Sequence, residues 1–236
     1  YWLHALASLV FITTLLGISV APVSARSEPL SLDSLLGGAR FLWNRPLLMS
    51  AVLLDMFAVL FGGAVALLPV YAKEILQVGA SGLGWMRAAP AIGAVAMSLV
   101  LAFAPPLQRA GRALLWSVIG FGAATIVFGL STNFALSFAA LALTGVCDTV
   151  SVLVRHSLIQ LHTPDQMRGR VSALNGMCIS ISNELGEFES GVVAWLIGPI
   201  GSVVAGGCGT MLVVAVVAVV YPELRRYGRL GSQGPP

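Results

Sequence analysis

Residues 47–71 read LLMSAVLLDMFAVLFGGAVALLPVY, an apolar stretch that contains one ionisable side chain, Asp55. An α-helix rises about 1.5 Å per residue and the hydrocarbon core of a bilayer is about 30 Å thick, so about 20 residues are enough to cross it. The regular alternation of polar and apolar residues that is typical of membrane β-barrels is missing from this stretch. We therefore predict a transmembrane helix.

Apolar stretches of similar length recur along the chain. Of its 236 residues, 57% are hydrophobic and 10% are charged, against about 25% charged residues in ordinary soluble domains. We predict an all-α integral membrane protein with seven transmembrane helices. Besides 47–71, the predicted spans are residues 3–21, 83–104, 113–130, 134–161, 171–197 and 202–221.

The first predicted span has two interpretations. Val23-Ser24-Ala25 follows the apolar stretch as a signal-peptidase site would, so residues 3–21 are alternatively a signal peptide. No basic region or methionine precedes them, and the apolar core is longer than that of a signal peptide, so a transmembrane helix is favoured. Residue 1 is Tyr and the apolar run begins at once, which predicts that the chain is a piece of a longer protein.

Two polar segments flank the remaining spans. In residues 22–46, leucines and an alanine recur at helical spacing from Leu32 to Leu42, after Ser31 as a possible helix cap. This pattern predicts a short helix that lies on the membrane surface. The tail, residues 222–236, is rich in Gly, Pro and Arg, and we predict that it is disordered.

Basic residues fall in alternate connections between the spans, whereas the other connections hold Lys73 alone. Because Lys and Arg accumulate on the cytoplasmic side of membrane proteins, this distribution predicts a multi-pass protein of the cytoplasmic (inner) membrane with a cytoplasmic C-terminus. The basic set comprises Arg26, Arg40, Arg45, Arg109, Arg112, Arg168, Arg170, Arg225, Arg226 and Arg229.

Several functional classes lack their signatures in this sequence. The net charge of +3 comes with no basic cluster, so no nucleic-acid partner is expected. Cys147, Cys178 and Cys208 stand alone in apolar runs without a metal-ligand spacing, so we expect no metal site, and we expect no cofactor. The three histidines are scattered and no catalytic motif accompanies them, so we do not expect an enzyme.

Ionisable side chains are unevenly distributed among the predicted spans. Each costs about 2.5 to 3.5 kcal/mol at the centre of a membrane helix, so each needs a partner, water or a purpose. The second, third, fifth and sixth spans carry them, and the first, fourth and seventh do not, which predicts that four helices surround a polar cavity. These residues are Asp55, Arg87, Asp148, Arg155, Glu184, Glu187 and Glu189.

The carboxylates have different expected roles. Glu184 and Glu187 share a helix face and raise each other's proton affinity, so they either handle protons or substrate or form a structural network with Arg87. Asp55 has no obvious partner nearby in the sequence, which favours a functional role over a hydrogen bond to a neighbouring helix. Arg155 lies near a span end, where we expect its side chain to extend to the lipid headgroups.

The sixth span is the most polar one and is predicted to line the cavity. The predicted substrate or proton pathway comprises Asp55, Arg87, Asp148, Asn175, Asn183, Glu184 and Glu187. Glycines within the spans are expected to allow helices to approach closely or to bend. These glycines are Gly62, Gly63, Gly93, Gly186 and Gly191.

Two basic loops resemble a known family. Gln108-Arg109-Ala110-Gly111-Arg112 is similar to the loop signature of the major facilitator superfamily, Gly-x-x-x-Asp-Arg-x-Gly-Arg, with Ala104 and Gln108 at the positions of its first Gly and its Asp. Arg168-Gly169-Arg170 resembles the corresponding loop one repeat later. With Asn183-Glu184-Leu185-Gly186, the sequence is most similar to the efflux branch that holds the enterobactin exporter.

The resemblance implies a domain organisation. Residues 1–21 would be the last helix of a missing N-terminal bundle and 22–46 the cytoplasmic link between two halves. Residues 47–221 would form the C-terminal six-helix bundle of the family's fold, followed by a cytoplasmic tail at 222–236. In this family the first, second, fourth and fifth helices of each bundle line the cavity, and these are the spans that carry the charges.

The resemblance also implies a function. The chain would be a fragment of a secondary active transporter, a proton-coupled exporter of a siderophore or drug-like small molecule that works by alternating access in the lipid bilayer together with the missing N-terminal half. A non-transporting membrane scaffold or a channel subunit remains the alternative. A seven-helix retinal receptor does not fit, because Lys73 lies at a helix end in the second span.

Overall fold

The computed structural model describes residues 2–17, 32–105 and 107–229. The proposed cap at Ser31, the first part of the linker and the last residues of the tail lie outside the described residues. The chain divides into two compact units, Tyr1–Ser31 and Leu32–Pro236.

The first unit contains α1 (Trp2–Leu16). The hydroxyl groups of its two threonines are satisfied within the helix, because Thr13 donates to the carbonyl of Val10 at 2.9 Å and Thr14 to that of Phe11 at 2.8 Å. Bonds of this kind let polar side chains sit in an apolar helix. The helical part of this prediction is confirmed for residues 2–16, and the predicted span beyond residue 17 lies outside the described residues.

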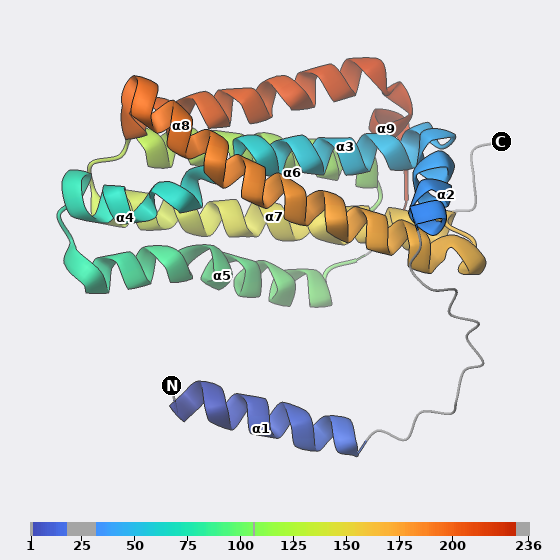
Figure 1. Cartoon of the computed structure of the whole chain (residues 1–236), viewed down its shortest axis with the longest axis horizontal. Coiled ribbons are helices and arrows are strands. Elements are labelled where there is room, and N and C mark those ends of the chain that lie inside the picture. Colours follow the sequence, from blue (N-terminus) through green and yellow to red (C-terminus); the bar gives the residue numbers. More distant parts are fainter. Residues whose placement is uncertain (1, 18–31, 106, 230–236) are drawn as a thin grey trace. The chain divides into compact units, whose positions relative to one another are not determined.

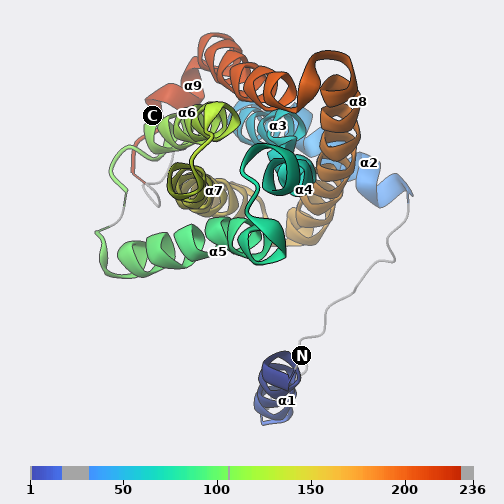
Figure 2. The same cartoon turned by 90° about the vertical axis from the view of Figure 1, so that its left-hand side faces the viewer.

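The second unit is built from helices that lie side by side (Figures 1 and 2), and every described element in it is helical. In chain order they are α2 (Leu32–Trp43), α3 (Pro46–Phe61), η1 (Gly63–Leu67), α4 (Leu68–Val70), η2 (Tyr71–Ile75), α5 (Gly79–Phe103), α6 (Ala110–Leu130), α7 (Phe134–His162), α8 (Asp165–Val220) and α9 (Pro222–Arg226). The all-α prediction is confirmed.

Among the described residues, five helical segments are long and apolar enough to cross a membrane. They are Pro46–Ile75, Gly79–Phe103, Ala110–Leu130, Phe134–His162 and Asp165–Val220. The last of these covers both the sixth and the seventh predicted span, so the structure does not give the predicted count of seven.

Helix α8 is interrupted in its middle. Gly198 has φ +83° and ψ 161°, and Pro199 follows it. Glycine adopts a positive φ at little cost, while proline disfavours a helical conformation of the residue before it. At this point the chain turns back, and the arms 165–197 and 199–220 run in opposite directions (Figure 1).

Glycines bring several helices into close contact. A Cβ atom at Gly93 of α5 would collide with the carbonyl of Ala142 on α7, and one at Gly145 of α7 would collide with the carbonyl of Pro90 on α5. A Cβ atom at Gly186 of α8 would lie 2.7 Å from the carbonyl oxygen of Leu60. The predicted use of glycine is thus confirmed for Gly93 and Gly186.

The packing role predicted for the other span glycines is mixed. A Cβ atom at Gly62 would lie 2.7 Å from the ring of Phe121, so Gly62 also permits a close approach. Gly191 has open space around it, with no neighbouring atom within 4 Å of an added Cβ. Packing therefore does not explain Gly191.

The ordered part of the tail contradicts the prediction of disorder for its first residues. Pro222 begins α9, a position that suits proline because the first N–H groups of a helix have no partner within it. Leu224 is fully buried and anchors the short helix. The backbone N–H groups of Ala110 and Gly111, at the start of α6, donate to the carbonyls of Gly228 at 2.9 Å and Tyr227 at 3.4 Å.

The segment before α3 forms the predicted helix. Leu42 of α2 is buried, and a Cβ atom at Gly38 would lie 3.2 Å from the carbonyl oxygen of Arg170, so α2 packs on the beginning of α8. Its position on a membrane surface stays a prediction. Together α2, α9, the start of α6 and the start of α8 occupy one end of the second unit (Figure 1).

Candidate functional site

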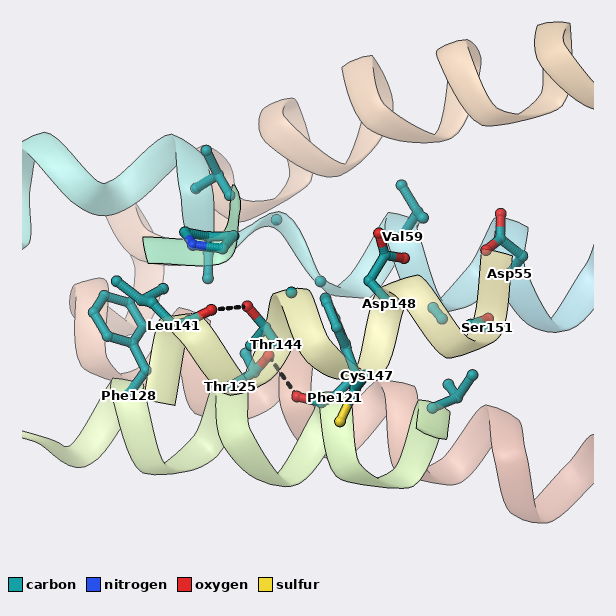
Figure 3. A pocket seen from close by; sticks show the side chains of 18 of the residues that line it. Asp55, Val59, Phe121, Thr125, Phe128, Leu141, Thr144, Cys147, Asp148 and Ser151 are labelled. Carbon is teal, nitrogen blue, oxygen red and sulfur yellow. Dashed lines mark hydrogen bonds between the residues drawn. The ribbon is translucent and has the colours of Figure 1, made fainter. Parts of the chain in front are cut away.

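A cavity of about 250 Å³ lies among the long helices of the second unit (Figure 3). Its wall is formed by residues of α3, η1, α5, α6, α7 and α8. Two buried apolar clusters, one containing Ala58 and Val118 and the other Ala64, Phe128 and Leu141, both contribute to it. The cavity, called the pocket below, therefore lies against the packed interior of the unit and is partly open.

Four of the seven residues predicted for a substrate or proton pathway line the pocket. Asp55 comes from α3, Asp148 from α7, and Asn183 and Glu187 from α8. Asn183 and Glu187 are four positions apart, so they share one face of their helix. The structure thus brings together side chains from three helices that are distant in the sequence.

The other three predicted residues lie elsewhere. Arg87 and Glu184 are exposed outside the pocket lining, and Asn175 is buried with its Oδ1 atom unpartnered among the described residues. The ion pairs found within residues 32–105 and 107–229 do not include Arg87. The proposed ion pair between Arg87 and a glutamate of α8 is therefore not formed.

Asp55 has a partner that sequence reasoning missed. Its carboxylate forms an ion pair with Nη1 of Arg155 on α7, and the two side chains are only 6% and 3% exposed, respectively. The prediction that Arg155 reaches the headgroups is wrong, since the side chain turns into the interior toward α3. Only the packing of α3 on α7 connects the two residues, so no local sequence signal marks the pair.

The pocket carboxylates that remain are accessible. Asp148 and Glu187 are both exposed, and Asp148 projects from α7 toward α3 (Figure 3). Asp148, Ser151 and Arg155 are spaced by three and four positions, so a single face of α7 carries an accessible carboxylate and a buried guanidinium. Water that enters the pocket can reach the first but not the second.

Hydroxyl groups in the pocket wall donate to their own helices. Ser117 donates to the carbonyl of Leu114 at 2.8 Å, Thr125 to that of Phe121 at 2.9 Å, and Thr144 to that of Leu141 at 2.6 Å. The second and third of these bonds are drawn in Figure 3. The groups left to meet a ligand are two carboxylates, one amide, the Ser151 hydroxyl and the Cys147 thiol, on an otherwise apolar wall. Such a site can exchange protons or hold the hydrogen-bond donors of an apolar molecule.

No three His, Cys, Asp or Glu side chains lie close enough together to hold a metal ion in the part of the chain that the structure describes. Cys147 borders the pocket, but its neighbouring acidic group is Asp148 alone on the same helix.

The loop motifs lie outside the pocket, at the end that carries α2 and α9. Arg109, Gly111 and Arg112 mark the start of α6, and a Cβ atom at Gly111 would collide with the carbonyl of Leu224. Beside Gly169, Arg168 pairs with Asp165 at 2.8 Å on the surface. Arg170 borders Gly37, whose added Cβ would be 3.7 Å from its Nη1 atom.

Comparison with known proteins identifies similar sequences. The sequence model of one protein family, described as Major Facilitator Superfamily, matches residues 1–187. The "Enterobactin exporter EntS" of Escherichia coli O1:K1 / APEC and that of Shigella boydii serotype 18 (strain CDC 3083-94 / BS512) are each 29% identical over 233 residues. The match covers 99% of this chain and 56% of each relative, so the chain spans about half the length of these curated relatives.

Proposed function

Because this chain belongs to the major facilitator superfamily, we propose that it is the C-terminal half of a proton-coupled exporter that moves a siderophore or a drug-like small molecule by alternating access. The observation that carries this proposal is the pocket, in which the exposed carboxylates of Asp148 and Glu187 project from two helices into an apolar cavity. The relatives named as enterobactin exporters support export over uptake.

The proposed topology follows the family organisation. The two arms of α8 are separate transmembrane spans, so that residues 47–221 form a six-helix bundle with four further spans. Residues 1–21 are the last helix of an N-terminal bundle, 22–46 a linker and 222–236 a tail. The coverage of 56% of each relative supports a preceding half of similar size.

The proposed orientation places α2, α9 and the basic loops on the cytoplasmic side of the inner membrane. Lys and Arg in short loops set this orientation. The substrate enters the pocket from the cytoplasm, and rocking of the two halves then opens it to the other side. No covalent bond changes in this cycle, so the protein acts as a transporter and not as an enzyme.

Asp148 and Glu187 couple the proton to the substrate in this mechanism. Both carboxylates line the same pocket, where each can bind a proton or accept a hydrogen bond from the substrate. Proton binding from the outer side weakens the bonds from the carboxylates to the substrate's hydrogen-bond donors and releases the substrate. Loss of the proton to the cytoplasm restores the binding state.

Export of enterobactin by the complete transporter tests the proposal. Cells that lack their own exporter are supplied with the transporter, and the catechol released into the medium is quantified by chromatography. We expect Glu187→Gln and Asp148→Asn each to lower export about tenfold, equivalent to about 1.4 kcal/mol. Glu184→Gln is the matched control, because Glu184 is on the same helix and exposed but outside the pocket.

Two results would count against the proposed function. Export that does not respond to collapse of the pH gradient would indicate a channel, and equal export by the Glu187 and Glu184 variants would remove the pocket from the mechanism. If no enterobactin leaves the cells, the same assay with a panel of fluorescent drug-like dyes decides whether any small molecule is exported.

A further inference from the structure

The carboxylates of the pocket occupy two different environments. Asp148 and Glu187 are exposed, whereas Asp55 is 6% exposed and faces a guanidinium that is 3% exposed. In a dry interior the desolvation cost of each ion is offset only by the other ion, so removing either charge leaves the other buried and unpaired. Protonation of Asp55 would therefore leave the Arg155 guanidinium buried without a counter-ion.

Within the part of the chain that the structure describes, Asp55 has no second ion-pair partner. Ala51 and Ala58, which flank it at helical spacing on α3, and the preceding Leu54 are buried and apolar. Nε of Arg155 has no hydrogen-bond partner among the described residues. A proton carrier must alternate between two protonation states, and this site stabilises only one of them.

The position of the pair indicates a mechanical role. It joins α3 to α7 at the end of the pocket nearest the start of α3, where Figure 3 places Asp55 beyond Asp148 and level with Ser151 in the view. On α7, Arg155 follows Asp148 by two helical turns, so the distance from α3 to the accessible carboxylate depends on where the pair holds α7.

We propose that Arg155 is a positioning residue which, through its buried pair with Asp55, fixes α3 against α7 at one end of the pocket. Asp55 then does not carry the transported proton. The exchange of protons then belongs to Asp148 and Glu187. This inference rests on the proposed function, because proton-driven export supplies the readout.

Removing both charges of the pair separates positioning from proton carriage. In the complete transporter, Asp55→Asn alone leaves Arg155 unpaired, and we expect export of enterobactin to fall at least about tenfold. The double variant Asp55→Asn/Arg155→Gln removes both buried charges, and we expect export within about twofold of the unaltered protein, with the same dependence on external pH. A proton carrier would not be rescued in this way.

The matched control applies the same logic to an accessible carboxylate. Asp148→Asn should stay impaired whether or not Arg155→Gln is added, because no buried cation depends on it. Immunoblotting of membrane fractions reports how much of each variant is inserted, and we expect the double variant to recover any abundance that Asp55→Asn loses.

The outcomes separate the two proposals. A double variant that remains as impaired as Asp55→Asn, in abundance or in export, overturns the positioning role, and so does an Asp55→Asn variant that exports normally. Absence of enterobactin export from the unaltered transporter, with every variant inserted, counts against the proposed substrate instead. The thermal unfolding midpoints of the purified variants then decide the inference, which requires the double variant to exceed Asp55→Asn.

Discussion

At the end of the pocket nearest the start of α3, Asp55 and Arg155 are buried and paired, while Asp148 and Glu187, farther along the same cavity, are exposed and have no ion-pair partner among the described residues. Both regions place charge inside helices that are long and apolar enough to span a bilayer. A counter-ion offsets the cost of charge in the first region, and in the second the carboxylates are open to the pocket. A carboxylate in a membrane helix therefore does not by itself indicate proton transport.

The largest expected effect comes from breaking the paired region. Arg155→Leu leaves the Asp55 carboxylate buried without a partner, and we expect a loss of about 3–5 kcal/mol of stability. Thermal or SDS-induced unfolding of the purified protein measures it. Arg168→Leu is the control, because its pair with Asp165 is 48% and 87% exposed and should contribute at most about 1 kcal/mol. Equal losses in the two variants would contradict the distinction between buried and exposed pairs.

The water accessibility of the pocket can be tested with a thiol that is already present. Cys147 lines the pocket next to Asp148, so in a Cys178→Ala/Cys208→Ala background it should react with a water-soluble methanethiosulfonate reagent. We expect saturating substrate to slow this reaction about tenfold, a change of about 1.4 kcal/mol in effective accessibility. Labelling followed by mass spectrometry measures the rate. A thiol that reacts only with lipid-soluble reagents would show that the pocket is dry.

A third environment is a buried polar group without a hydrogen-bond partner among the described residues. The Tyr227 hydroxyl has no hydrogen-bond partner among the described residues, while the ring stacks edge-on against His162 with centroids 5.5 Å apart. Removing such a hydroxyl relieves a desolvation cost, so we expect Tyr227→Phe to change stability by no more than about +1 kcal/mol at neutral pH. Unfolding midpoints measure the change, and a clear loss would indicate a hidden partner.

The pH dependence of this variant adds a check outside the membrane spans. Burial raises the pKa of Tyr227, so the folded state holds the phenol proton more tightly than the unfolded state does. The stability is undiminished below the ordinary tyrosine pKa of about 10 and falls as the pH rises from there through the raised pKa. Tyr227→Phe should lose less stability than the unaltered protein between about pH 9 and 11.

The smallest effect on stability is expected at an exposed carboxylate. Glu187→Gln removes a carboxylate that water can reach, so we expect its stability to change by less than about 0.5 kcal/mol. This result, together with reduced export, would show that the residue serves transport and not folding. A loss of stability comparable to that of Arg155→Leu would contradict the distinction between the buried ion pair and the exposed carboxylates.

The helical fold could be predicted from the sequence because long apolar runs have few alternatives in a bilayer. Four of the predicted pathway residues line one pocket. The prediction that only the spans with ionisable residues surround it is wrong, because α6, whose predicted span carries no charge, lines it with Ser117, Phe121 and Thr125 among others. The sequence also predicted the boundary between the last two spans, because the break at Gly198 and Pro199 lies between the predicted spans 171–197 and 202–221. The exact span count rests on the proposed topology.

The Asp55–Arg155 pair could not be predicted, because it depends on how α3 and α7 pack. Periodicity locates a residue on its own helix but does not give the rotation of one helix against another. For the same reason Glu184 and Glu187, which share a face by spacing, differ in the structure: only Glu187 lines the pocket. The order of the tail was missed because Gly, Pro and Arg dominate its composition, while the contacts that anchor it, buried Leu224 and the backbone hydrogen bonds of Tyr227 and Gly228 with the start of α6, depend on tertiary packing.

The beginning of α6 depends on carbonyl groups that come from the far end of the described chain. The first N–H groups of a helix have no acceptor within it, and here Ala110 and Gly111 receive theirs from Gly228 and Tyr227. The ribosome makes the donors long before the acceptors, so this helix start is completed only after synthesis has passed residue 228. An affinity tag fused directly after that residue would therefore disturb the start of α6 as well as the C-terminal segment that carries the tag.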